Sequence, residues 1–360
     1  MKENRANGRK LRDSNIELLR IIAMFVIVCS HSTFSVFDEL KEYPEATNAL
    51  LQYMISGGGK IGINIFMLIS GFYMCKMDIS LYKFTKLIVQ IYFYDLIIGA
   101  FLFIMGIADF SISNILDYVF PFRYNGIDYF PTAFLFFYVS IPFWRILVDN
   151  LNQRLHQYFL AFGFVYYVLY TDLPITITPQ IDAVLWFGYL YAISAYIRLY
   201  VDILSCHKKI GLIAIVLLFL ICISVPILWR WTHLDPQMLF SSANSILALG
   251  FSISVFIWFK GANISNSPII NTIAASTFGV LLIHSGSSVI RGFIWQRMIP
   301  GHEWFLSNLY IFYMLGSVLL IYIVCTFIDV GYKKLIEKKL VDCLYYQICR
   351  MRSCKSSLHS

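Results

Sequence analysis

Residues 14–37 read SNIELLRIIAMFVIVCSHSTFSVF, an apolar stretch long enough to cross a membrane that contains Arg20 and His31. The two residues are eleven apart, which places them within about 20° of one helix face and roughly 16 Å apart along the axis. Ionisable side chains inside a membrane span are costly and usually mark function. The stretch therefore predicts a membrane helix with a functional site along one face.

The composition predicts an integral membrane protein. Hydrophobic residues make up 59% of the chain and charged residues only 14%, whereas about a quarter of the residues in soluble domains are charged. We predict an all-α, polytopic bundle of about ten transmembrane helices, near 15–37, 61–76, 86–108, 128–147, 156–171, 182–199, 210–229, 241–259, 268–290 and 304–331. Residues 110–127 are too broken to span, and we expect them to form an interfacial or re-entrant piece that covers the mouth of the site.

The basic residues predict the orientation of these spans. With both termini in the cytoplasm, 22 of the 28 Lys and Arg residues fall on the inner side, as the positive-inside rule requires. The chain then divides into a basic cytoplasmic tail (1–14), a membrane domain (15–332) and a second basic cytoplasmic tail (333–360). The net charge of +7 is thus a topology signal, and we predict no nucleic-acid site. The expected location is the cell membrane, as a multi-pass protein among membrane lipids, with a bacterial plasma membrane favoured.

The cysteines do not indicate a disulfide or metal site. All eight fall within predicted spans or on the inner side, at positions 29, 75, 206, 222, 325, 343, 349 and 354. Their spacing in the C-terminal tail matches no zinc pattern. We therefore expect no metal.

Helix arithmetic brings polar residues from three spans to two depths. His31 lies roughly 22 Å along its helix and His284 roughly 24 Å along the span that begins at 268, both in the outer third of a core of about 30 Å. Arg20 and Lys76 lie at the inner end, and Asn64 lies roughly 18 Å above Lys76, near the histidines. The sequence predicts a continuous polar column with cations at the cytoplasmic mouth and imidazoles near the outer mouth.

The two ends of this column suit different chemistry. Arg20 and Lys76 are suited to a phosphate-bearing ligand, because guanidinium and ammonium groups pair with phosphate through charge-assisted hydrogen bonds. A histidine that titrates near neutral pH is suited to removing a proton from a hydroxyl. Structural roles stay open: helix–helix hydrogen bonding for the histidines, snorkelling for Arg20 and positive-inside anchoring for Lys76.

The order of motifs resembles the acyltransferase-3 family of membrane acyltransferases that modify surface carbohydrates. The resemblance covers most of the chain and is carried by NIELLRIIAMFVIVCSHS (15–32), GINIFMLISGFYMCK (62–76), IDYFPTAFLFFYVSIPF (127–143), YLYAISAYIRLY (189–200), STFGVLLIHS (276–285) and CTFIDVGYKKL (325–335). It implies acyl transfer, usually of acetyl from acetyl-CoA, to sugar hydroxyls of an exopolysaccharide or another cell-envelope glycan.

The same resemblance implies roles for individual residues. His31 matches the family's catalytic candidate and Arg20 the arginine eleven residues before it. Glu17 stands where many members carry Asp, Asn64 replaces an acidic residue, and Lys76 stands alone where many members carry two arginines. We expect an acyl-CoA donor and a glycan or lipid-linked sugar acceptor, with glycan-assembly proteins as candidate partners.

The mechanism predicted from these assignments places acetyl-CoA phosphates on Arg20 and Lys76, with the pantetheine arm reaching His31. His31 then acts either as a base on the sugar hydroxyl or as a carrier of the acetyl group. Glu17, as a second catalytic residue, orients the guanidinium of Arg20 from one turn away.

The acceptor is expected to contact three further side chains. His284 and Asn64 are candidates for binding acceptor hydroxyls or polarising the thioester carbonyl, and Tyr129 for stacking on a sugar ring.

Two other functions stay open at this stage. A transporter or flippase for a lipid-linked glycan would also need a polar column, although the sequence shows neither paired repeats nor broken helices of the usual transporter type. A membrane module that recruits partners through its tails would leave both intramembrane histidines unexplained.

Overall fold

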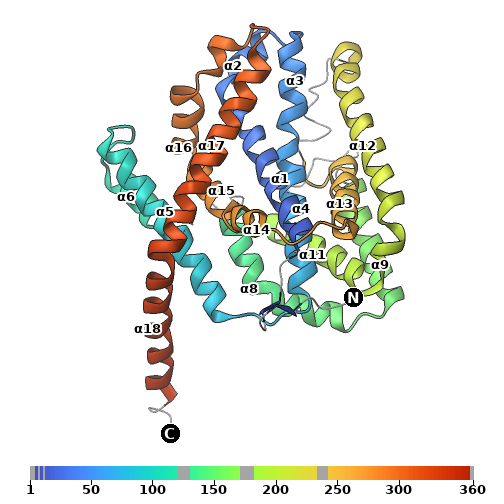
Figure 1. Cartoon of the computed structure of the whole chain (residues 1–360), viewed down its shortest axis with the longest axis vertical. Coiled ribbons are helices and arrows are strands. Elements are labelled where there is room, and N and C mark those ends of the chain that lie inside the picture. Colours follow the sequence, from blue (N-terminus) through green and yellow to red (C-terminus); the bar gives the residue numbers. More distant parts are fainter. Residues whose placement is uncertain are drawn as a thin grey trace.

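The apolar stretch that begins at Ser14 forms one unbroken helix, α1 (Ser14–His31), in the computed structural model (Figure 1). The structure describes residues 5–6, 9–10, 13–120, 130–170, 182–232 and 242–356. Asp13 precedes α1, and its carboxylate accepts hydrogen bonds from the Lys260 ammonium and, at 2.7 Å, from the Tyr73 hydroxyl. These bonds tie the beginning of α1 to two other helices.

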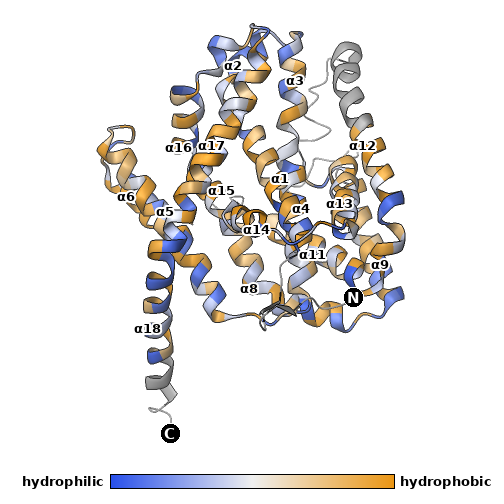
Figure 2. Ribbon diagram, in the orientation of Figure 1, coloured by the Kyte–Doolittle hydropathy of each residue, from blue (hydrophilic) through white to orange (hydrophobic). Residues whose placement is uncertain are grey.

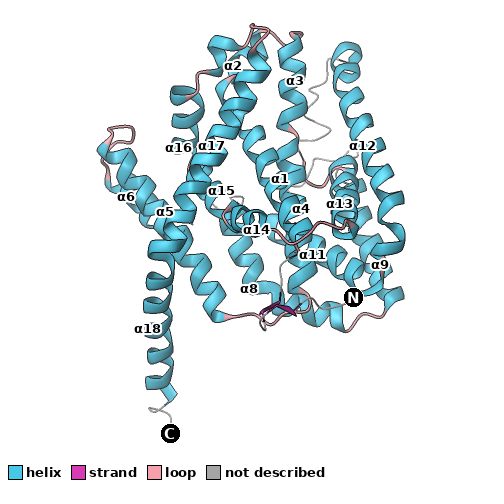
Figure 3. Ribbon diagram, in the orientation of Figure 1, coloured by secondary structure: helices cyan, strands magenta, loops and turns pink. Residues whose placement is uncertain are grey.

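Helices make up nearly all of the described chain (Figure 3), which confirms the all-α class. Two short strands, β1 (Arg5–Ala6) and β2 (Arg9–Lys10), pair antiparallel before α1. After α1 come η1 (Ser32–Ser35), α2 (Phe37–Glu42), α3 (Thr47–Ser56), α4 (Gly58–Met74), α5 (Leu81–Ile104), α6 (Ile112–Val119), α8 (Phe130–Asp149), α9 (Gln153–Phe164), η2 (Val165–Leu169), α11 (Ala183–Tyr200), α12 (Ile203–Thr232) and α13 (Ile246–Gly261). The last part comprises α14 (Pro268–Ala275), α15 (Thr277–Ser285), α16 (Ser288–Gly292), η4 (Phe293–Met298), η5 (Gly301–Trp304), α17 (Tyr310–Tyr332), η6 (Lys333–Glu337) and α18 (Lys338–Ser356).

Among the described residues, six helical segments are long and apolar enough to cross a membrane. They are Ser14–Ser35, Thr47–Met74, Leu81–Ile104, Phe130–Asp149, Pro268–Ser285 and Tyr310–Met351. Apolar residues occur along most helices of the bundle, as Figure 2 shows. The other predicted spans fall on α9 with η2, α11, α12 and α13, of which α13 is a shorter apolar helix. The count of ten and the orientation of the termini stay predictions.

Helix α1 lies between two apolar cores. Met24, Ile27 and Val28, in its C-terminal half, belong to a core formed mainly with α3, α5, α15 and α17. Ile16 and Leu19, near its N-terminus, belong to a second core formed with α4, α8, α11 and α13. Side chains on α1 are therefore held from several directions, which fixes their positions.

Close approach of α4 to α1 depends on a glycine. A Cβ added to Gly62 would lie 2.7 Å from the carbonyl oxygen of Ala23 and 2.6 Å from Cγ1 of Ile27. The first of these neighbours is backbone, which cannot move aside without displacing the helix. Small residues permit such backbone contact between membrane helices, and α4 is thereby held directly beside the predicted site.

The predicted span at 268–290 is a broken helix. It is interrupted at Ser276, between α14 and α15, and α15 ends at Ser285 before the turn Gly286–Ser287. The Lys333 ammonium donates a hydrogen bond to the carbonyl of Ala275, the last residue of α14, and pairs with Asp329 at 2.6 Å. A cation at a helix C-terminus stabilises the unpaired carbonyls there. The interruption is one residue long, and Pro268–Ser285 still forms a single candidate span.

Two segments outside the main bundle bear on the predictions. Helix α6 has eight residues, too few to span a bilayer, and its expected interfacial position stays a prediction. Helix α18 continues from α17 through the π-helical turn η6 and extends away from the bundle (Figure 1). It is held at its base by a hydrogen bond of 2.9 Å from Tyr82 to Asp342.

Candidate active site

The structure brings His31 and His284 into direct contact. His31 is the last residue of α1 and His284 is next to last in α15. His31 Nδ1 lies 2.9 Å from His284 Nε2, and the two ring centroids are 5.1 Å apart. His284 is completely buried. The two histidines that the sequence places at similar depth in separate spans therefore form one pair of side chains.

The hydrogen-bond partners assign a tautomer to each histidine. His284 Nδ1 lies 2.5 Å from the carbonyl oxygen of Val280, which can only accept, so His284 carries its proton on Nδ1. Its Nε2 is therefore a lone-pair acceptor, and His31 Nδ1 must be the donor between the two rings. His31 Nε2 then bears a lone pair and has no hydrogen-bond partner in the part of the chain that the structure describes.

A polar network fixes the turn that follows His31. The Gln52 amide on α3 donates to the hydroxyls of Ser32, at 3.1 Å, and Thr33, at 2.9 Å. Its carbonyl oxygen accepts a hydrogen bond of 2.9 Å from Tyr310 on α17. Gln52 is completely buried, and a satisfied buried network of this kind restrains the groups that it joins. It holds the end of α1, and with it His31, against two other helices.

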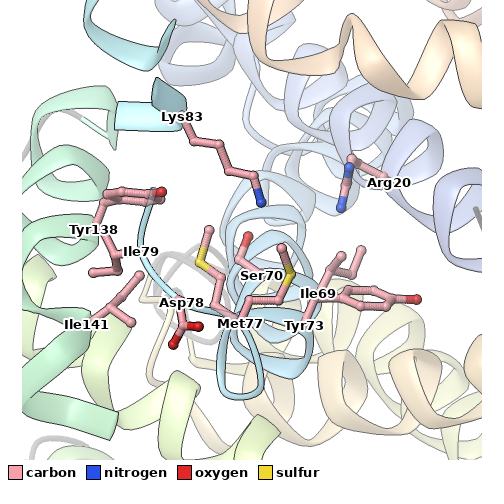
Figure 4. Close-up of a pocket in the computed structure, with 11 residues that line it drawn as sticks. Arg20, Ile69, Ser70, Tyr73, Met77, Asp78, Ile79, Lys83, Tyr138 and Ile141 are labelled. Atoms are coloured by element: carbon pink, nitrogen blue, oxygen red, sulfur yellow. The ribbon is translucent and has the colours of Figure 1, made fainter. Parts of the chain in front are cut away.

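A second polar feature lies near the other end of α1. Arg20 lines a cavity of about 150 Å³ together with residues of α4, α5, α8 and the loop before α5, among them Ser70, Tyr73 and Lys83. Its guanidinium pairs with Glu17 at 3.3 Å, as predicted for these neighbours. Figure 4 shows the Lys83 ammonium and the Arg20 guanidinium extending toward each other over Ser70.

The second cation at this cavity is Lys83, and Lys76 does not line it. Lys76 lies exposed in the turn after α4. Lys83 belongs to the first turn of α5, where its backbone N–H donates to the capping hydroxyl of Ser80. The acidic residue at the cavity, Asp78, forms an ion pair of 2.6 Å with Arg145. Its negative charge is therefore compensated by Arg145, which does not line the cavity.

The Arg20 cavity and the histidine pair are separate in this structure. Neither histidine lines the cavity. On the α1 face that joins them lie Met24 and Ile27, which are 1% and 4% exposed. The continuous polar column predicted from the sequence is therefore interrupted by packed apolar side chains, because helix periodicity reveals which residues share a face but not what fills the space between them.

The remaining predicted residues differ in what surrounds them. The Asn64 side chain is completely buried, donates to the carbonyl of Ala243 at 2.6 Å and accepts from the Trp186 indole at 3.0 Å. These bonds join α4 to α11 and to the segment before α13, and a role in acceptor binding stays a prediction.

Tyr129 lies outside the described residues. Within the described part of the chain, no group of three or more His, Cys, Asp or Glu side chains is suited to binding a metal.

Comparison with known families defines the class of protein. The acyltransferase-3 family model, described as an acyltransferase domain, matches residues 13–329, nearly the whole chain. The chain belongs to this family and is a multi-pass membrane acyltransferase. No curated protein and no solved structure was found to match it.

Proposed function

We propose that this protein transfers an acetyl group from cytoplasmic acetyl-CoA to a hydroxyl of an exported polysaccharide or its lipid-linked precursor. The observation that carries the proposal is the contact between His31 and His284, which leaves His31 Nε2 with a lone pair. A neutral imidazole nitrogen held in this way is suited to general-base or nucleophilic catalysis. The family match supports acyl transfer as the reaction.

The cavity beside Arg20 is the proposed donor site. Arg20 and Lys83 present two cationic groups to one space, and such groups bind phosphates through charge-assisted hydrogen bonds. A volume of about 150 Å³ holds only part of a nucleotide, so the rest of the donor would remain on the cytoplasmic side. Glu17 orients the Arg20 guanidinium through their ion pair.

The acyl group must then travel from this cavity to His31. Eleven residues of helix separate the two side chains, roughly 16 Å, a distance that a thin, extended pantetheine arm can cover. The arm would follow the α1 face at Met24 and Ile27 and displace their side chains. Methionine adapts easily to such a change because its side chain is unbranched and flexible.

Two versions of the chemical step use the same nitrogen. In the first, His31 Nε2 takes the proton of the acceptor hydroxyl, the oxygen attacks the thioester carbonyl, the C–S bond breaks and the proton passes to the thiolate. In the second, Nε2 itself attacks the thioester carbonyl, the C–S bond breaks and the thiolate of coenzyme A leaves. The acceptor hydroxyl then attacks the acetyl group on Nε2, the N–C bond breaks to restore neutral His31, and the hydroxyl proton passes to the thiolate. In both, His284 is a positioning residue, because its Nε2 accepts a hydrogen bond from the Nδ1–H of His31 and thereby stabilises positive charge on the His31 ring.

The experiment that tests this proposal follows labelled acetyl from acetyl-CoA into glycan acceptors with purified protein in lipid vesicles. The variant His31→Ala should transfer acetyl at a rate about 1000-fold or more below wild type, because general-base catalysis typically contributes factors of about 100 to 10,000. His284→Ala should lose less, and His284→Gln should recover part of that loss because its amide oxygen can accept from His31 Nδ1.

The matched control is His156→Gln. His156 is also a completely buried histidine, but it lies on α9, where its Nε2 bonds to the carbonyl of Ala192. The His156→Gln variant should transfer acetyl at nearly the wild-type rate. Wild-type transfer by His31→Ala, or equal losses for all three histidines, would contradict the assignment.

A transporter or flippase is the second candidate, and the interruption of α14–α15 at Ser276 favours it, since broken helices line substrate sites in transporters. This candidate predicts that a lipid-linked glycan moves between leaflets without acquiring label. Labelled acceptor in the experiment above excludes it as the sole function.

A further inference from the structure

A second cavity, of about 240 Å³, lies beside the end of α15 and is separate from the Arg20 cavity. It is formed by the outer half of α5, the loop and helix α6 that follow, and the turn after α15; its polar lining residues are Asp95, Asp109, Asn114, Asp117, Tyr118 and Ser287. Neither the donor site nor the histidine pair uses these side chains.

Asp95 provides this cavity with a buried hydrogen-bond acceptor that has no donor in the described part of the chain. The residue is 5% exposed, and its Oδ2 atom has no hydrogen-bond partner among the described residues. A buried carboxyl oxygen left without a donor is costly. Because Asp95 lines the cavity, a ligand hydroxyl bound there would supply the missing donor.

The rest of the cavity is fixed by contacts within the chain. Gly99 on α5 permits Tyr118 to pack against the helix, since a Cβ there would lie 2.5 Å from the tyrosine ring. Tyr118 also stacks edge-on against Phe103, with centroids 5.6 Å apart. The Asn114 amide donates to the carbonyl of Asp109 at 2.8 Å and thereby braces the loop between α5 and α6.

The cavity is close to His284 along the chain. Gly286, in its wall, is two residues after His284, which places the two Cα atoms within about 7 Å. The turn packs directly on α5, because a Cβ on Gly286 would lie 3.5 Å from Ile98.

The lining selects a class of ligand. Three of the polar lining residues are aspartates, and none of the described residues that line the cavity is a Lys or Arg. Carboxylates accept hydrogen bonds from hydroxyls, an amide and a phenol serve as further partners, and an aromatic ring offers a face for an apolar sugar surface. A ligand that carries its own carboxylate or phosphate would meet like charge in a site of low dielectric.

We propose that this cavity binds one sugar ring of the acceptor that bears no negative charge, with Asp95 accepting hydrogen bonds from its hydroxyls. The inference rests on the proposed function, because it places the acceptor beside the histidine pair. It adds a specificity: neutral sugar rings are accepted and uronic acids or sugar phosphates are rejected.

A binding measurement tests the inference independently of acyl transfer. Purified protein in lipid vesicles is titrated with methyl glycosides of neutral hexoses and with the matching methyl uronides, and binding is followed by isothermal calorimetry. At least one neutral glycoside should bind the wild-type protein about tenfold or more tightly than its uronide. Asp95→Leu should abolish binding of the neutral ring, and Asp95→Asn should reduce the discrimination against the uronide, because the amide removes the charge and keeps one acceptor oxygen.

The control is Asp38→Asn, an exposed carboxylate on α2, which should leave both affinities unchanged. Absence of binding by every neutral glycoside, equal binding of uronides, or unchanged binding by Asp95→Leu would overturn the proposal. If glycosides bind as expected while the wild-type protein transfers no acetyl group, the proposed function fails and the sugar site stands.

Discussion

The two histidines of the pair differ in what they offer a substrate. Both nitrogens of His284 are engaged, one by the carbonyl of Val280 and the other by His31. His31 is engaged through Nδ1 only, within the described part of the chain, and its Nε2 keeps a lone pair. The residue with reactive capacity is therefore the one at the end of α1, and its neighbour fixes its tautomer.

At the Arg20 cavity, the lysine that lines the space is Lys83 and not Lys76, which the sequence analysis assigned to phosphate binding. Arg20→Ala and Lys83→Ala should each raise the Michaelis constant for acetyl-CoA by about tenfold or more, because each removes a charge-assisted hydrogen bond. Their effect on the acceptor's Michaelis constant should be small. Initial rates at varied donor and acceptor concentrations measure both.

Lys76→Ala is the matched control for Lys83→Ala. It removes the same charge from an exposed position outside the cavity, and its donor Michaelis constant should stay within about twofold of wild type, as exposed charges contribute little. The reverse ranking of the two lysines would restore the assignment of Lys76 made from the sequence.

Some of these residues could be predicted from sequence and others could not. His31, His284 and Arg20 stand out because ionisable groups are rare in apolar spans. Lys83 does not, since it is one of several lysines expected in inner loops, where the positive-inside rule explains them all. Asp95 lies within a span in the same way as the histidines, and the rule that singled them out would also have found it. Gln52 gave no signal, because an amide in a helix has too many structural uses.

At the scale of elements, the main difference between expectation and structure concerns what lies between the two ends of α1. Spacing places Arg20 and His31 on one face, and the helix confirms this. The same face carries Met24, which three-dimensional packing buries in the first core. The break at Ser276 was also missed, because the sequence around it is apolar and contains no internal proline; its compensating contact comes from Lys333, far along the chain.

The route proposed for the acyl donor makes α1 itself testable. Met24→Trp should lower the rate of acetyl transfer by about 100-fold, because the larger side chain blocks the face that the pantetheine arm follows. Donor affinity should change by less than about threefold, since the phosphates still reach the Arg20 cavity. Transfer assays and calorimetric binding of acetyl-CoA give the two quantities.

Overpacking by itself costs about 1–3 kcal/mol of stability, so a second buried methionine serves as control. Met67 is completely buried on α4 in the other core and does not line the cavity. Met67→Trp should therefore retain both the rate of acetyl transfer and the affinity for the donor. A Met24→Trp protein that binds donor and transfers acetyl at the wild-type rate would show that the arm takes another path.

At the scale of the whole molecule, one helical bundle separates a cationic cavity from a histidine pair along its central helix. Helix α18 extends beyond the end of the bundle at which α1 begins (Figure 1). It contacts Tyr82, next to Lys83 of the Arg20 cavity, so the proposed donor site and the C-terminal helix lie on the same side. The cavity at Asp95 instead has Gly286, two residues after His284, in its wall. This arrangement allows a charged donor to remain on one side of the membrane while its acyl group is delivered near the other.

The most direct test of this arrangement is a sidedness measurement in sealed vesicles. The orientation of the protein is first determined by protease access to α18, and labelled acetyl-CoA is then supplied on one side at a time, with glycan acceptor on both. We predict that label enters the acceptor only when acetyl-CoA is on the side of α18. Equal labelling from either side, or labelling only from the side opposite α18, would contradict the account.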